Sequence, residues 1–183
     1  MKNKNFNTAI FAGGCFWCTE AKFRNLNGVI SVVSGYTGGK LENPTYEQVS
    51  ERKTGHLEAV KIKFDSEKVS YEKLLDIYWR SINPTDEHEQ FADKGNQYKT
   101  AIFYEDKGQK NEAESSKKEI EKFLGKKVST KILPAKKFYS AEEGHQNYAG
   151  KNPIRYKTYE VLSGRKNYLK KIWSWFFNTP YIA

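Results

Sequence analysis

A chain of 183 residues is long enough to bury a hydrophobic core of its own, and its length is typical of one domain. The net charge of +9 comes from 31 Lys and Arg against 22 Asp and Glu, and basic pairs such as Lys117-Lys118 and Lys170-Lys171 are dispersed along the chain. Dispersed charge is typical of a solvated basic surface and argues against nucleic-acid binding, which needs a basic stripe interleaved with aromatic residues.

The beginning of the chain lacks the features of an export signal. The segment MKNKNFNTAIFAGG has two lysines but neither a long apolar region nor a small-residue cleavage site. No segment approaches the roughly 18 apolar residues that span a bilayer. We therefore expect a cytoplasmic protein that does not associate with a membrane.

The first elements surround the two cysteines of the chain. Thr8 to Ala12 is a short apolar run that ends at Gly13-Gly14, which predicts a strand running into a tight turn. An irregular apolar stripe from Phe16 predicts a helix, and it places Cys15 at the N-terminus of that helix. The β-branched run Val29 to Ser34 predicts a second strand.

The segment HLEAVKIKF, residues 56–64, alternates with a period of two, which predicts a strand. One face carries Leu57, Ala59, Lys61 and Lys63, and the other carries Glu58, Val60, Ile62 and Phe64. Glu58 therefore lies on the apolar side of the predicted strand.

The remainder of the chain predicts further helices and strands in alternation. Ser70 is a candidate N-cap for a helix that reaches Ile82 and ends before Pro84. Further predictions are strands over 100–104 and 128–133, a helix over 111–124 closed by Gly125, a short helix with the capping box Ser140 and Glu143, and a terminal helix over 168–177.

This order of elements predicts the fold class. Strands separated by helices, with alternating rather than continuous apolar patterns, favour a two-layer α+β sandwich over a doubly wound parallel sheet. We expect one domain over residues 1–183, in which residues 151–183 form a C-terminal helical extension.

The pair Cys15-x-x-Cys18 has three common interpretations: a redox dithiol, half of a zinc site, or two inert buried cysteines. A structural zinc site needs four ligands, and His56, His88 and His145 do not have zinc-finger spacing. Two cysteines in a chain of this size are too few for a disulfide scaffold. A general C-x-x-C dithiol oxidoreductase of the thioredoxin type remains the alternative.

The residues between and opposite the cysteines indicate a more specific chemistry. A helix N-terminus lowers the pKa of a thiol, so Cys15 is the candidate nucleophile, and Cys18 is placed to attack the product. Phe16 and Trp17 can form a pocket for a small apolar group, and desolvation would raise the pKa of Glu58. A thiolate, a protonated acid and a methyl-sized pocket suit attack on a polar sulfur that bears a methyl group.

A set of motifs in order along the chain resembles the methionine sulfoxide reductase A family. These motifs are GGCFWCTE, GVISVVSGYTGG, NPTYEQV, TGHLEAVKI, DKGNQYKTAIFY and AEEGHQNY, and they extend from about Thr8 to Tyr148. The resemblance implies a peptide-methionine (S)-S-oxide reductase built on a two-layer α+β domain around a mixed sheet with flanking helices. Its substrate would be methionine sulfoxide, free or in peptides and proteins, and we expect no cofactor and no metal ion.

The resemblance also implies a role for each matching residue. Cys15 would be the nucleophile, with Phe16 and Trp17 forming the pocket for the methyl group of the sulfoxide. The other matches are Glu58 as the acid that protonates the sulfoxide oxygen, Tyr46 and Tyr98 as hydroxyl donors around that oxygen, Asp93 as a group that holds the substrate backbone, and His145 as structural support.

The chain departs from many relatives at the resolving cysteine. Those relatives have glycine at the position of Cys18 and a cysteine near the C-terminus, but residues 151–183 contain no cysteine. The resolving role therefore moves to Cys18 or to an external thiol, and a disulfide would form from the sulfenic acid of Cys15. We expect thioredoxin or another thiol reductant to regenerate the enzyme.

Overall fold

The computed structural model describes residues 6–173. Six of its strands form one mixed sheet in the order β7-β6-β1-β3-β2-β8, in which β6 and β7 are parallel and the other pairs are antiparallel. The strands of this sheet are β1 (Phe6–Gly13), β2 (Val29–Thr37), β3 (Leu57–Asp65), β6 (Thr100–Tyr104), β7 (Lys131–Pro134) and β8 (Tyr139–Ser140). The strands β4 (Glu89–Gln90) and β5 (Asp93–Lys94) form a separate antiparallel pair.

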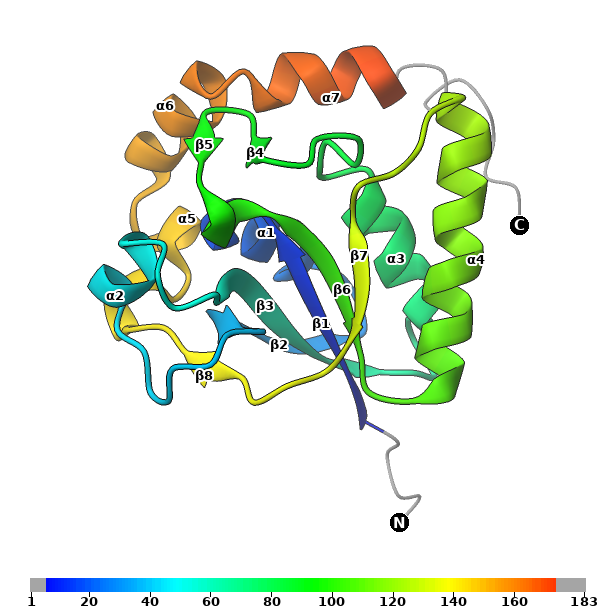
Figure 1. The fold of residues 1–183 in the computed structure, drawn as a ribbon, viewed down its shortest axis with the longest axis horizontal. Helices are drawn as coiled ribbons and strands as arrows, with labels where there is room; N and C mark the ends of the chain where they lie inside the picture. The colour runs from blue at the N-terminus through cyan, green and yellow to red at the C-terminus, as the bar shows by residue number, and fades with distance from the viewer. Residues whose placement is uncertain (1–5, 174–183) are drawn as a thin grey trace.

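Helices cover one face of the sheet, its β7 edge and one of its ends (Figure 1). In that view α1 and α3 lie behind the sheet, α4 runs beside its β7 edge, and α6 and α7 follow one another along the end where β4 and β5 lie. The helices are α1 (Phe16–Phe23), α2 (Tyr46–Ser50), α3 (Tyr71–Trp79), α4 (Lys107–Leu124), α5 (Tyr148–Lys151), α6 (Pro153–Leu162) and α7 (Arg165–Trp173), with 3-10 turns at Asn96–Tyr98 and Glu143–His145. The two-layer α+β class is confirmed.

The alternation of β3 divides the core as predicted. Val60, Ile62 and Phe64 pack with the helices in the main core, whereas Ala59 packs in a smaller cluster on the opposite face of the sheet. Glu58 lies on the helix side and is 3% exposed. The register that pairs Glu58 with Tyr36 of β2 therefore holds a carboxyl group under the helical layer.

Two predicted helix boundaries were wrong. The Oγ of Ser70 accepts from the Lys73 amide, as an N-cap should, but α3 ends at Trp79 and not at Ile82, since the Ser81 hydroxyl donates to the Tyr78 carbonyl. Helix α4 begins four residues before the predicted start at 111, because Asp106 caps it by accepting from the Gln109 amide at 2.8 Å.

The predictions beyond α4 were less accurate. The strand expected over 128–133 begins only at Lys131, since the Ser129 amide donates to the Pro84 carbonyl outside the sheet. Ser140 belongs to β8 and caps no helix. The terminal helix begins at Arg165, three residues before its predicted start, and residues 174–177 of the expected helix lie outside the described part of the chain. Helix α6 lies within the helical extension expected over 151–183, although its bounds were not predicted.

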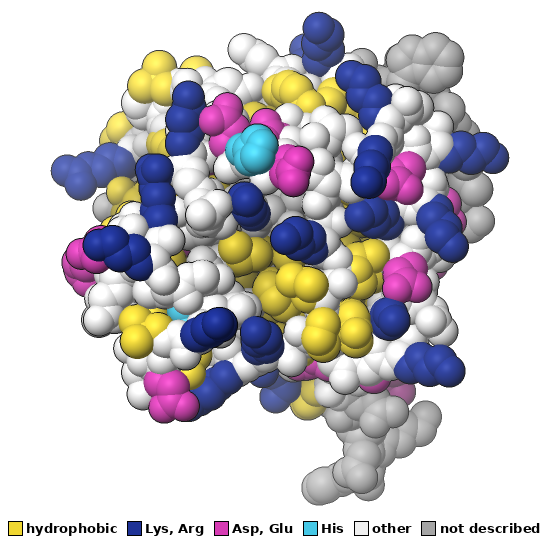
Figure 2. Space-filling view, viewed as in Figure 1, with side chains coloured by type: hydrophobic (Ala, Val, Ile, Leu, Met, Phe, Trp, Pro, Cys, Tyr) yellow, Lys and Arg dark blue, Asp and Glu magenta, His cyan; other side chains and the backbone are white. Residues whose placement is uncertain are grey.

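The surface agrees with the expected dispersion of basic charge. Lys and Arg side chains are scattered over the face shown in Figure 2, with Asp and Glu among them. No basic stripe crosses that face. Within residues 6–173, each helix is too short or too polar to traverse a bilayer.

Candidate active site

A tight turn between β1 and α1 positions the two thiols. Gly14 has φ +82, and a Cβ at that position would lie 2.6 Å from the Cβ of Gln90, so only glycine fits there. Cys15 follows as the N-cap of α1, and its carbonyl accepts from the amides of Cys18 and Thr19 at 3.1 and 3.2 Å. Cys15 therefore lies at the helix N-terminus, as predicted, and Cys18 lies one turn further along the same helix.

A cavity of about 50 Å³ opens at this helix N-terminus. Its walls come from α1, α2, β3, β5, the turn before β6, and α6. They are formed by Cys15, Phe16, Trp17, Tyr46, Glu58, Asp93, Tyr98 and Tyr159. The structure thus places together seven of the eight residues selected from the sequence. Cys18 is not part of the cavity wall and is fully buried beside Cys15.

Glu58 is held by the backbone of the helix that follows Cys15. The amide of Phe16 donates to its Oε2 at 3.0 Å. Burial raises the pKa of Glu58 to about 8, in spite of that hydrogen bond. The carboxyl group is therefore mainly protonated at neutral pH, which is the state that a proton donor requires.

The two thiols share a hydrogen bond and titrate together. Burial first, and then the hydrogen bond to Cys18, raise the pKa of Cys15. The same hydrogen bond lowers the pKa of Cys18 to about 7. The prediction that the helix N-terminus gives Cys15 a lowered pKa was therefore wrong for the buried, reduced pair, in which the lowered pKa belongs to Cys18.

Phenol groups complete the polar side of the cavity. Burial, followed by the charge of Glu58, raises the pKa of Tyr46 and of Tyr98. Both phenols therefore remain protonated and able to donate a hydrogen bond at neutral pH. Tyr46 is held by Glu142, whose Oε1 accepts from the Tyr46 amide at 2.8 Å and whose Oε2 accepts from the Tyr36 hydroxyl at 2.9 Å.

Two aromatic contacts hold Trp17 in the cavity wall. The ring of Tyr148 stacks on Trp17 with centroids 3.8 Å apart, and the Trp17 Nε1 donates to the Nδ1 of His145 at 3.2 Å. His145 also lies 4.4 Å from the ring of Tyr46, centroid to centroid. The expected supporting role of His145 therefore rests on a direct contact with two wall residues.

Tyr159 is a wall residue that the sequence analysis missed. Its hydroxyl donates to both carboxylate oxygens of Asp93, at 2.6 and 2.5 Å. It lies on α6, in the expected helical extension, where no motif pointed to a site residue. The dipeptide Asn152-Pro153 was the available signal, since proline is favoured in the first turn of a helix and Pro153 begins α6.

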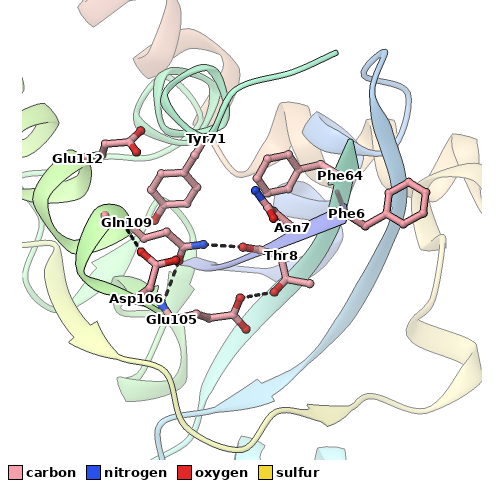
Figure 3. A pocket seen from close by; sticks show the side chains of 10 residues that line it. Phe6, Asn7, Thr8, Phe64, Tyr71, Glu105, Asp106, Gln109 and Glu112 are labelled. Carbon is pink, nitrogen blue, oxygen red and sulfur yellow. Dashed lines mark hydrogen bonds between the residues drawn. The ribbon is translucent and has the colours of Figure 1, made fainter. Parts of the chain in front are cut away.

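A larger cavity of about 310 Å³ lies elsewhere, between the start of β1 and the start of α4 (Figure 3). There the carboxylate of Glu105 accepts from the Thr8 hydroxyl, and the Nε2 of Gln109 donates to the Thr8 carbonyl at 2.7 Å. No sulfur atom lines this cavity. The larger cavity therefore offers no thiol.

Two neighbouring thiols can also be part of a metal site. Across residues 6–173, no three His, Cys, Asp or Glu side chains are grouped so that they could hold a metal ion. A zinc ion on Cys15 and Cys18 would have to take its remaining ligands from outside this part of the chain.

Known proteins resemble the chain over most of its length. The sequence model of the family described as "Peptide methionine sulfoxide reductase" matches residues 7–176. A peptide methionine sulfoxide reductase MsrA of Bacillus licheniformis is 50% identical over 167 residues, which cover 90% of this chain and 92% of that protein. A namesake from Ligilactobacillus salivarius is 51% identical over 170 residues, or 92% of this chain and 98% of that protein.

Solved structures of similar proteins have the same fold. Reduced Mxr1 from Saccharomyces cerevisiae matches with a TM-score of 0.79 and 30% identity, over 84% of this chain and 89% of its own. Methionine sulfoxide reductase A of Corynebacterium diphtheriae matches with a TM-score of 0.75 and 28% identity, over 84% of this chain and 78% of its own. With the family match over residues 7–176, this similarity shows that the chain belongs to the peptide methionine sulfoxide reductase family and is an oxidoreductase.

Proposed function

We propose that this reductase acts on the S epimer of methionine sulfoxide, free or in proteins, and repairs oxidised proteins. One observation carries the proposal: the cavity sets the Cys15 thiol beside a carboxyl group, Glu58, that is mainly neutral at pH 7. Phe16 and Trp17 supply an apolar wall for the methyl group, and Asp93 is placed to hold the substrate backbone. A tetrahedral sulfur bound by its methyl group and its oxygen can present only one epimer to Cys15.

The proposed first step transfers the sulfoxide oxygen to Cys15. Cys15 passes its proton to the Cys18 thiolate and attacks the sulfoxide sulfur, while Glu58 donates a proton to the oxygen. The attack forms a bond between the two sulfur atoms, and this bond and the sulfur–oxygen bond of the substrate then break as the hydroxyl group passes to the Cys15 sulfur. Methionine leaves, and Cys15 carries the oxygen as a sulfenic acid. Hydrogen bonds from Tyr46 and Tyr98 stabilise the oxygen as it takes the proton.

The proposed second step forms a disulfide between Cys15 and Cys18. The yeast relative Mxr1 has also been solved in a complex with Trx2, which supports a thioredoxin-type dithiol as the reductant here. Cys15 is only 6% exposed and Cys18 is fully buried, so the disulfide has to become accessible before such a partner can attack it.

The same burial disfavours a general dithiol oxidoreductase. Of the two reduced thiols, Cys15 opens on a cavity of about 50 Å³ and Cys18 is fully buried. A cavity of this size accommodates the end of one side chain but no disulfide of a folded protein.

The pH profile of Glu58→Gln tests the proposed function. In the wild-type protein kcat/KM should rise as the thiol pair ionises near pH 7 and fall as Glu58 loses its proton near pH 8. The variant should lose a factor on the order of 10² to 10⁴ in kcat/KM, the range for loss of a general acid, and it should lose the alkaline limb of the profile. The measurement is methionine release across this pH range.

Glu114→Gln is the matched control, because Glu114 is exposed on α4 and the change in charge is the same. It should retain the wild-type profile. A Glu58→Gln protein with near-normal rates and an unchanged alkaline limb would show that Glu58 is a buried structural carboxyl and not the acid.

A further inference from the structure

A buried cation, the guanidinium of Arg165, lies against the turn that precedes the thiol pair. Arg165 begins α7 and is 1% exposed. Its Nη1 donates to the Ser81 carbonyl at 2.8 Å, and its guanidinium lies over the Phe91 ring, 4.4 Å from the centroid. A Cβ built on Gly14 would lie 3.2 Å from its Nη2, so the guanidinium packs directly against the turn that carries Cys15.

The charge of this guanidinium is incompletely balanced by the described residues. Its Nε and Nη2 are buried and make no hydrogen bond within residues 6–173. The nearest carboxylate is that of Asp93, whose Oδ2 is 3.9 Å from Nη2 and whose two oxygens already accept from Tyr159. A buried cation is costly unless an anion compensates it, so this position favours a second negative charge close by.

The second negative charge is available at Cys18. The hydroxyl of Tyr156, on α6, is hydrogen-bonded to the sulfur of Cys18, and the Tyr156 side chain is 9% exposed. Helices α6 and α7 thus bring a phenol and a guanidinium toward the same sulfur atom. We propose that Arg165 and Tyr156 are positioning residues that hold Cys18 as a thiolate for its attack on oxidised Cys15.

The charges around Cys18 agree with this proposal. The hydrogen bond from Cys15 lowers the pKa of Cys18 most, burial opposes it, and the Arg165 charge and the Tyr156 hydroxyl lower it further. The groups that face the two thiols are Tyr46 on α2, Glu58 on β3, Asp93 on β5, Tyr98 in the turn before β6, Tyr156 and Tyr159 on α6, and Arg165 on α7. Arg165 is the one cation in this set.

The inference rests on the proposed resolving role of Cys18. In that step Cys18 releases to solvent the proton that it took from Cys15, and its thiolate attacks the sulfenic sulfur of Cys15. The sulfur–sulfur bond forms and the sulfur–oxygen bond breaks. The oxygen leaves as water after taking a proton from solvent. Residues 151–183, which contain no cysteine, would then contribute an arginine and a phenol to resolution.

Titration of Cys18 in the Cys15→Ser background tests the proposal without requiring activity. Thiolate absorbance near 240 nm, followed against pH, reports Cys18 as the remaining thiol. Adding Arg165→Gln should raise its pKa by about one unit or more, the effect of removing a close opposite charge. Arg165→Lys should restore most of the shift, and Tyr156→Phe should raise the pKa by a smaller amount.

The rate of disulfide formation is the second readout. With Cys15 present, Arg165→Gln should slow the step about five- to tenfold between pH 6 and 7, and the rates should converge in alkali, where Cys18 is ionised in both proteins. Lys166→Gln is the matched control, because it removes the same charge from an exposed neighbour on α7.

An unchanged Cys18 pKa in folded Arg165→Gln would overturn the proposal. Should that variant fail to fold, Tyr156→Phe decides, and an unchanged pKa there would also overturn it. Failure of the proposed function would be seen separately, as an absence of methionine release from the wild-type protein.

Discussion

Replacing Cys15 by serine is expected to abolish methionine release from methionine sulfoxide. The serine hydroxyl ionises far above neutral pH, and the Cys18 thiolate, with a pKa of about 7, is too weak a base to remove its proton. Glu58 is protonated and cannot act as that base either. The experiment measures methionine released over many enzyme equivalents of substrate, with circular dichroism to show that the variant is folded.

The size of this effect distinguishes a nucleophile from a binding residue. Removing a wall residue such as Phe16 weakens binding and leaves the attacking group in place. Removing the sulfur of Cys15 leaves no group in the cavity wall that can accept the oxygen, because Cys18 is not exposed there. Detectable turnover by folded Cys15→Ser would rule out Cys15 as the attacking group.

Cys18→Ser is expected to separate the two steps. Glu58, the cavity and the Cys15 sulfur are retained. The variant loses Cys18 as the acceptor of the Cys15 proton, but it also loses the hydrogen bond and charge of Cys18 that raise the pKa of Cys15, so Cys15 can release its proton to solvent. One methionine per chain should therefore still be released in a single turnover. Steady-state turnover with thioredoxin should collapse, since Cys15 would remain a sulfenic acid and no intramolecular disulfide could form.

The control for Cys18→Ser is a small thiol in excess. Such a thiol can form a mixed disulfide with Cys15 directly, so it should partly restore turnover where thioredoxin does not. Single-turnover release and the thioredoxin-linked rate are measured side by side for the variant and the wild-type protein. A variant that keeps its thioredoxin-linked rate would show that Cys18 does not resolve the sulfenic acid.

Local patterns were sufficient for the part of the site that lies on regular elements near the cysteines. The Gly13-Gly14 turn after an apolar strand indicated that Cys15 begins a helix, and α1 does begin at Phe16. The period-two pattern of β3 indicated that Glu58 faces the apolar side, and its side chain is buried there. Both inferences depend on residues within a few positions of the functional group.

The residues that α6 contributes to the candidate site could not be predicted from the hydrophobic pattern of the sequence. Its apolar residues Ile154, Val161 and Leu162 are 81%, 60% and 80% exposed, so hydrophobic periodicity points away from the face that meets the site. The face toward the candidate site instead carries Tyr156 and Tyr159, whose partners are distant in the sequence.

The sequence also could not predict which of the two thiols has the lowered pKa. A helix N-terminus favours the thiolate at Cys15, but burial and the neighbouring sulfur determine where the charge lies. Both effects depend on the packed structure, in which Arg165 reaches the turn from the far end of the described chain.

The stereochemistry of unreacted substrate tests the central claim most directly. Wild-type protein is given racemic methionine sulfoxide and excess dithiol until methionine release stops, and the remaining sulfoxide is resolved by chiral chromatography. A cavity that binds the methyl group on Phe16 and Trp17 and the oxygen beside Glu58 should consume the S epimer and leave the R epimer, with release stopping near half conversion. Equal consumption of both epimers would contradict the proposed geometry of attack by Cys15.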